Sequence, residues 1–148
     1  MKNTLHQYPK MKLLKTTLLL GLILILVYSF RLHRLQSDNE KMIIGIWVFH
    51  NHENQISAYK KKKKFDNKEG GIEFKENGLL IKRQNSGWCG TPPIDYGNFD
   101  GTWESTSDST LTIRYKYWGG EAEQDLLIKK LTKTELHFKT LEYRTEEK

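Results

Sequence analysis

The chain has 148 residues, which is enough for one domain after a short N-terminal region. Its aromatic content of 11% supplies the apolar surface that a packed core needs and argues against a wholly disordered chain. The formal net charge of +6 would suit nucleic acid, but residues 1–42 carry seven basic against two acidic residues and hold most of that excess. The charge pattern therefore argues against a nucleic-acid-binding face.

An uncharged apolar segment follows the basic residues 1–12. Residues 16–30 read TTLLLGLILILVYSF, and a helix that is apolar on every side is typical of a membrane span. We expect a transmembrane anchor helix at 13–31 and a polar linker at 32–42. A cleaved signal peptide is the alternative, but no small-residue cleavage site follows the apolar core.

Positive charge on the two sides of this segment predicts its orientation. Four lysines precede it, whereas Arg31 and Arg34 follow closely. The larger basic side faces the cytoplasm in most membrane proteins. We therefore expect a single-pass protein whose N-terminus is cytoplasmic, whose anchor contacts membrane lipid, and whose remaining residues form a domain on the extracytoplasmic side.

Residues 43–144 carry the signals of a small all-β domain. Turn residues separate short runs rich in β-branched and aromatic residues, and no amphipathic helical pattern lies between them. We expect about eight strands, at 43–50, 56–65, 72–76, 79–83, 95–104, 110–118, 125–131 and 135–141. Their spacing favours antiparallel neighbours in a sandwich or an up-and-down barrel. Residues 145–148 are charged and are expected to fray.

Asn77-Gly78 is the clearest hairpin signal in this region. It separates two alternating runs, and both residues tolerate the positive φ angles of a type I′ turn.

Four sequence fragments, in this order, resemble small bacterial lipocalin-like domains. They are Gly45-x-Trp47, Ile72-x-Phe74 with Asn77-Gly78, Gly101-x-Trp103, and the closing run from Leu127 to Leu136. The resemblance covers roughly residues 43–142 and implies an antiparallel up-and-down barrel of about eight strands. It implies structural roles for Gly45, Trp47 and Trp103, and it places Arg144 against the Trp of the first strand.

A second group of aromatic residues forms the candidate ligand-binding site. It comprises Trp88, Tyr96, Tyr115, Tyr117 and Trp118. These side chains could line the mouth of a barrel, as small-ligand sites are mostly aromatic and apolar. Packing against strand faces is the alternative.

The lysine run at 60–64 also allows two interpretations. It suits a solvated loop or edge strand, and it could contact anionic lipid or an acidic partner.

No catalytic or metal-binding pattern stands out in the sequence. His50, His52 and Glu53 form one close set that could bind a metal, but two histidines and one loop carboxylate are thin evidence for a site. The sequence has no phosphate-binding glycine loop and no HExxH or Gly-x-Ser-x-Gly motif. We therefore expect neither an enzyme nor a cofactor.

The leading hypothesis is a membrane-tethered, non-catalytic lipocalin-like domain that binds a small apolar ligand or lipid. A protein-interaction module of the cell envelope, using aromatic loops and the lysine run, is the alternative. An enzyme whose site is not visible in one sequence is the third.

Overall fold

The structure is a computed structural model that describes residues 21, 25, 38–87 and 89–147. Residues Ser37–Lys148 form one compact unit and Met1–Gln36 form another. No helix among the described residues is long and apolar enough to cross a bilayer. The anchor predicted at 13–31 and the basic residues before it lie outside the described residues, apart from 21 and 25.

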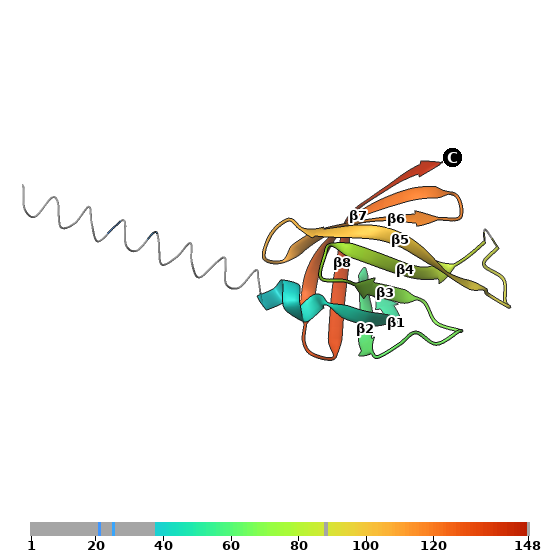
Figure 1. Ribbon diagram of the computed structural model, residues 1–148, viewed down its shortest axis with the longest axis horizontal. Helices are drawn as coiled ribbons and strands as arrows, with labels where there is room; N and C mark the ends of the chain where they lie inside the picture. Colours follow the sequence, from blue (N-terminus) through green and yellow to red (C-terminus); the bar gives the residue numbers. More distant parts are fainter. Residues whose placement is uncertain (1–20, 22–24, 26–37, 88, 148) are drawn as a thin grey trace, which may run out of the picture. The chain divides into compact units, whose positions relative to one another are not determined.

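Eight antiparallel strands close into a barrel in the second unit (Figure 1). In chain order they are β1 (Gly45–Glu53), β2 (Ile56–Lys62), β3 (Gly71–Phe74), β4 (Leu79–Asn85), β5 (Tyr96–Ser105), β6 (Thr110–Tyr117), β7 (Gly120–Leu131) and β8 (Glu135–Glu147). The predicted all-β class, closed barrel and strand number are confirmed. Closure pairs strands that would otherwise be sheet edges.

The order of strands around the barrel differs from the simple up-and-down order that we expected. Strands β3 to β8 follow one another, but β1 lies between β2 and β3, and β2 pairs with β8. Asn54 and Gln55 have φ angles of 50° and 65°, which suit a tight hairpin between β1 and β2. Residues 63–70 then cross β1 to reach its other edge. This longer connection allows β1 and β2 to exchange places relative to an up-and-down barrel.

The hairpin predicted at Asn77-Gly78 is confirmed, although its turn is longer than expected. Residues 75–78 separate β3 from β4, and the backbone N–H of Lys75 donates to the carbonyl of Leu79 at 3.0 Å. Only Gly78 has a positive φ, of 74°, so the two-residue type I′ turn was wrong. Hairpin loops longer than two residues commonly need one residue in this left-handed region, and Gly adopts it without strain.

One end of the barrel is filled by the hydrophobic core. Trp47 is fully buried there, and its Nε1 donates to the carbonyl of Ile43 at 2.5 Å. Residues 38–43 form a helical turn, and Ile43 is 1% exposed. Residues 38–42 of the predicted linker belong to this helical turn, and residues 32–37 lie outside the described residues. We call this end of the barrel the closed end.

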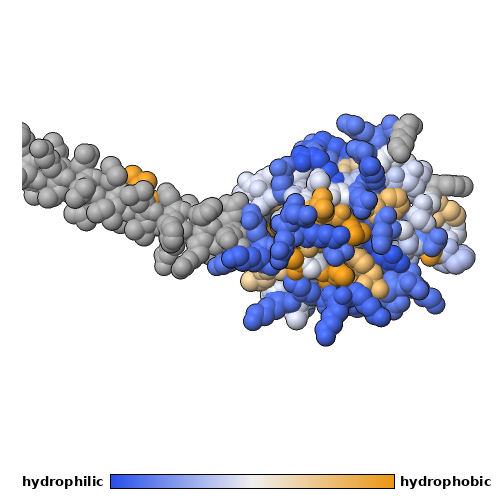
Figure 2. Space-filling view, in the orientation of Figure 1, coloured by the Kyte–Doolittle hydropathy of each residue, from blue (hydrophilic) through white to orange (hydrophobic). Residues whose placement is uncertain are grey.

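The opposite end of the barrel, here called the mouth, is bordered by three connections. These are the turn between β1 and β2, residues 86–95 between β4 and β5, and the short turn after β6. Strand β8 continues to Glu147, through residues predicted to fray, because Ala122 to Gly120 of β7 pair with Thr145 to Glu147. On the face seen in Figure 2, hydrophobic side chains lie among hydrophilic ones.

All the buried core residues of the cluster around Trp47 lie between Ile43 and Phe138. The unit Ser37–Lys148 thus contains a closed barrel and its own core. A domain with these two properties is expected to fold by itself.

Candidate functional site

The mouth holds a pocket with a volume of about 350 Å³. Four aromatic side chains line it, namely Tyr115, Tyr117, Trp118 and Tyr143. Gln84, Asn85, Gly87 and Gly90 complete its wall. A volume of this size lies near the lower limit for sites that enclose a small ligand.

Strand alternation on β6 explains why two of these tyrosines share the mouth. Leu111 and Ile113 are buried in the core, and Tyr115 and Tyr117 continue the same face toward the mouth. Tyr117 then meets Trp118 edge-to-face, with ring centroids 5.8 Å apart. This alternation was visible in the sequence, and the structure brings three of the predicted residues together.

Tyr143 joins the mouth from β8 and was not predicted. It pairs with Gln124 of β7, which in turn pairs with Ile113 of β6. Side chains at paired positions share one face of a sheet, so Tyr143 faces the same side as Ile113. The sequence places Tyr143 near the chain end, and only the long β7–β8 pairing carries it to this site.

The buried phenol groups of Tyr59 and Tyr115 stay neutral over the physiological pH range. Burial, and then the neighbouring Tyr143, raise the pKa of Tyr115 well above its usual value. Burial raises the pKa of Tyr59 to about 12, although Ser57 acts in the opposite direction. These hydroxyl groups can donate or accept hydrogen bonds without adding charge to the mouth.

Lys82 places a charged group beneath the mouth, and sequence reasoning missed it. It pairs with the buried Ile72 on β3 and with Phe99 on β5, so its side chain enters the barrel. Its Nζ lies 5.5 Å from the centroid of the Tyr115 ring. Burial lowers the pKa of this amine to about 8. The sequence signal for this position is that Lys82 lies two residues after Leu80 on β4, so the two side chains share the inward face of the strand.

Two of the five predicted aromatic residues do not belong to the described mouth. Tyr96 lies on β5 beside Gly70, where a Cβ added to the glycine would be 3.3 Å from the tyrosine ring. It contacts the connection between β2 and β3 and does not line the pocket. Trp88 lies outside the described residues.

Of the two tryptophans predicted to be structural, Trp47 lies in the core and Trp103 packs against it. Trp47 is fully buried. Trp103 meets Phe74 edge-to-face at 5.5 Å, and its Nε1 donates to the carbonyl of Lys75 at 3.0 Å. Both residues therefore stabilise the closed end.

The cation that covers Trp47 is Lys61, and the resemblance had pointed to Arg144 instead. Lys61 Nζ lies 4.8 Å from the Trp47 ring and donates to the carbonyl of Met42 at 3.2 Å. Its stem lies against Gly45, whose φ is 125°. Arg144 is ion-paired with acidic residues, among them Asp125 at 2.8 Å, because it stands on the half of β8 beyond its pairing with β2.

Arg144 belongs to a charged cluster of β5, β6, β7 and β8. Its other members are Glu104, Arg114, Glu123, Asp125 and Glu142. Hydrogen bonds from Arg144 and Arg114 hold the pKa of Glu123 below its usual value. Charges that satisfy one another in this way stabilise a strand surface and leave none free for a ligand.

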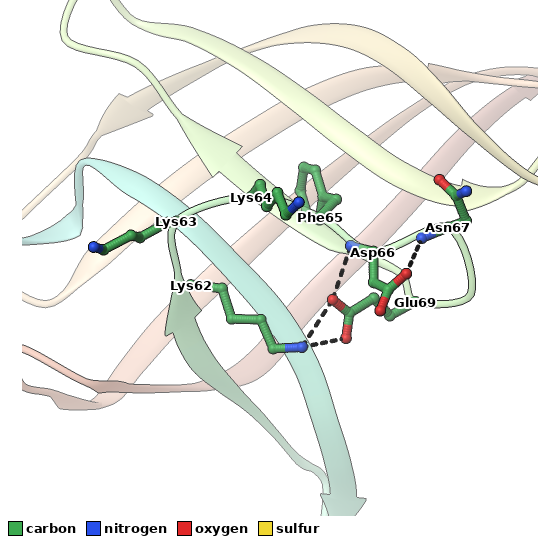
Figure 3. Close-up of a pocket in the computed structure, with 7 residues that line it drawn as sticks. All are labelled: Lys62, Lys63, Lys64, Phe65, Asp66, Asn67 and Glu69. Carbon is green, nitrogen blue, oxygen red and sulfur yellow. Dashed lines mark hydrogen bonds and ion pairs between the residues drawn. The ribbon is translucent and has the colours of Figure 1, made fainter.

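The lysine run at 60–64 is divided among different environments. Lys62 pairs with Glu69 at 2.7 Å beside a surface pocket of about 410 Å³, and Lys63 extends away from this pair (Figure 3). The backbone N–H of Asp66 also donates to Glu69. The last residue of β2 and the loop that follows it line this pocket, and Lys62–Glu69 is the ion pair among them.

The remaining candidate groups do not form a site in the described part of the chain. The pairing register of β1 shifts between Phe49 and Asn51, which interrupts the alternation that would align His50 with His52. No group of three potential metal ligands occurs among residues 38–87 and 89–147. Cys89, the only cysteine, is exposed, and its hydrogen bond with Thr91 lowers the pKa of the thiol.

Comparisons with known proteins leave the family of this chain open. No protein-family model matches the sequence, and neither the curated proteins nor the solved structures gave a significant match.

Proposed function

We propose that the barrel is a non-catalytic binding domain whose mouth takes up the apolar part of a small ligand. We also propose that the N-terminal apolar segment holds it at a membrane. The observation that carries the proposal is the pocket of about 350 Å³ lined by four aromatic rings. Burying apolar ligand surface against such rings contributes roughly 25 cal/mol per Å².

The closed β-barrel is compatible with a lipocalin-like ligand-binding domain. The core fills the closed end, so the space for a ligand is the mouth and not a deep central cavity. Compact aromatic ligands or short chains fit this volume better than long-chain lipids.

Titration with N-phenyl-naphthylamine, an uncharged probe that fluoresces in apolar surroundings, tests this function. We expect saturable binding to the unit Ser37–Lys148, after circular dichroism has shown that the unit is folded. Tyr143→Ala removes an exposed aromatic wall of the mouth and should weaken binding about fivefold, since stacking on one ring contributes on the order of 1 kcal/mol.

Tyr96→Ala is the matched control, because it removes the same side chain from the other face of the sheet. It should leave the dissociation constant unchanged. A signal that does not saturate, or that Tyr96→Ala reduces as much as Tyr143→Ala, would reject a ligand site at the mouth.

Protein contact is the second candidate function, and one observation favours it. Strand β8 pairs with β2 only from Glu135 to Lys139, so residues 140–147 have a strand on one side only. Leu141 and Tyr143 are each 54% exposed there. However, this edge also carries Glu142, Arg144, Glu146 and Glu147, and charged residues discourage strand addition. The mouth is therefore the stronger candidate.

A further inference from the structure

Beside the mouth lies a cation that the barrel does not neutralise. Lys82 Nζ lies over the Tyr115 ring, 5.5 Å from its centroid, and makes no ion pair or hydrogen bond within the described residues. Lys62, in contrast, is paired with Glu69, and Lys61 donates to a backbone carbonyl. A lysine inside a protein usually has an anionic partner, because removing its charge from water is costly.

The backbone of β4 fixes this amine beneath the pocket. Lys82 lies two residues before Gln84 on the same strand face, and Gln84 lines the mouth. The Lys82 amine lies over the Tyr115 ring, and Tyr115 also lines the mouth. Lys82 does not itself line the pocket, but it is partly exposed, and its Nζ lies 5.5 Å from the centroid of the Tyr115 ring, which does line it.

We infer that the mouth binds small amphipathic anions and that the Lys82 ammonium group is the counter-charge for their carboxylate, sulfonate or phosphate. This inference rests on the proposed function and specifies its ligand class. The apolar part of the ligand would lie against Tyr117, Trp118 and Tyr143 at the entrance. The neutral phenol of Tyr115 could add a hydrogen bond to the anion.

A pair of probes that differ by one charge tests the inference. Anilinonaphthalene sulfonate has the ring system of N-phenyl-naphthylamine with an added sulfonate. We expect the unit Ser37–Lys148 to bind the sulfonate more tightly than the uncharged probe. Lys82→Met keeps the length of the side chain and removes its charge, so it should weaken sulfonate binding about tenfold and leave the uncharged probe unaffected.

Lys116→Met is the matched control, because Lys116 is an exposed lysine on β6 that neighbours Tyr115 but faces the outside. It should change neither affinity. The inference fails if Lys82→Met leaves the sulfonate affinity unchanged while both probes still bind. It also fails if Lys116→Met weakens sulfonate binding as much as Lys82→Met does. Failure of both probes to bind the folded wild-type unit would instead reject the proposed function itself.

Discussion

At the scale of single residues, the barrel interior combines apolar side chains with one charged group near the mouth. Lys82 shares the interior with Tyr115, and burial depresses the pKa of its amine from 10.5 to about 8. A depressed lysine pKa means that the folded state disfavours the charged amine relative to the unfolded chain. Lys82 therefore reduces the stability of the fold, and such a cost is common at functional sites.

Replacing Lys82 with Met should stabilise the barrel unit at neutral pH, by on the order of 2–3 kcal/mol. Below pH 8 the wild-type amine is charged in both states, and the full penalty applies. Between pH 8 and 10.5 the unfolded chain binds more protons than the folded one, so wild-type stability rises with pH. The advantage of the variant should shrink across this range. Urea unfolding at pH 7 and pH 10 measures both effects, and equal advantages at the two pH values would contradict them.

At the scale of elements, the connection between β2 and β3 decides the strand order. Residues 63–70 cross β1, and Phe65 packs at Gly71, the first residue of β3. The Phe65 ring has a second neighbour, because the Arg83 guanidinium lies over it, 5.9 Å from the ring centre. The absence of a side chain at Gly71 allows this close packing, since an added Cβ would lie 2.8 Å from the Phe65 ring.

Gly71→Ala should destabilise the barrel unit by about 1–3 kcal/mol, because the added methyl group overlaps with Phe65 and with the backbone of β1. Thermal unfolding measures this change. Gly87→Ala is the control, since its added Cβ would have no atom within 4 Å. If the two variants unfold at the same temperature, β1 and Phe65 do not approach Gly71 as closely as described.

At the scale of the whole molecule, the barrel unit contains its own core, and the mouth lies at the opposite end from the helical turn at 38–43. The proposed membrane attachment rests on residues 13–31, which lie outside the described residues apart from 21 and 25. The orientation proposed from the flanking charges places the barrel on the extracytoplasmic side. Cys89 offers a direct way to examine this orientation.

A membrane-impermeant maleimide should label Cys89 in intact cells that express the full chain. Cys89 is the only thiol of the protein and is exposed, so labelling reports which side of the membrane the barrel occupies. Cys89→Ser should abolish the signal. Labelling that appears only after the cells are lysed would place the barrel inside and overturn the orientation.

Much of the fold could be predicted because it depends on local sequence. The alternation of Leu111, Ile113 and Tyr115 identifies a strand and its buried face, and all eight predicted strands correspond to strands of the barrel. Lys82 could not be assigned to the interior in the same way. Its position two residues after Leu80 points inward, but a lysine there reads as a solvent-facing residue, and the adjacent Arg83 allows the opposite assignment.

The sequence by itself determined that this chain has a small all-β domain with eight strands and that β6 carries tyrosines toward one end. Period-two alternation is a local property of each strand, so it can be seen without knowing the partner strands. Only the tertiary structure decided that β1 and β2 are exchanged, that Tyr143 joins the mouth, and that Lys82 lies beneath it. Those features depend on pairings between distant segments, which the closure of the barrel fixes.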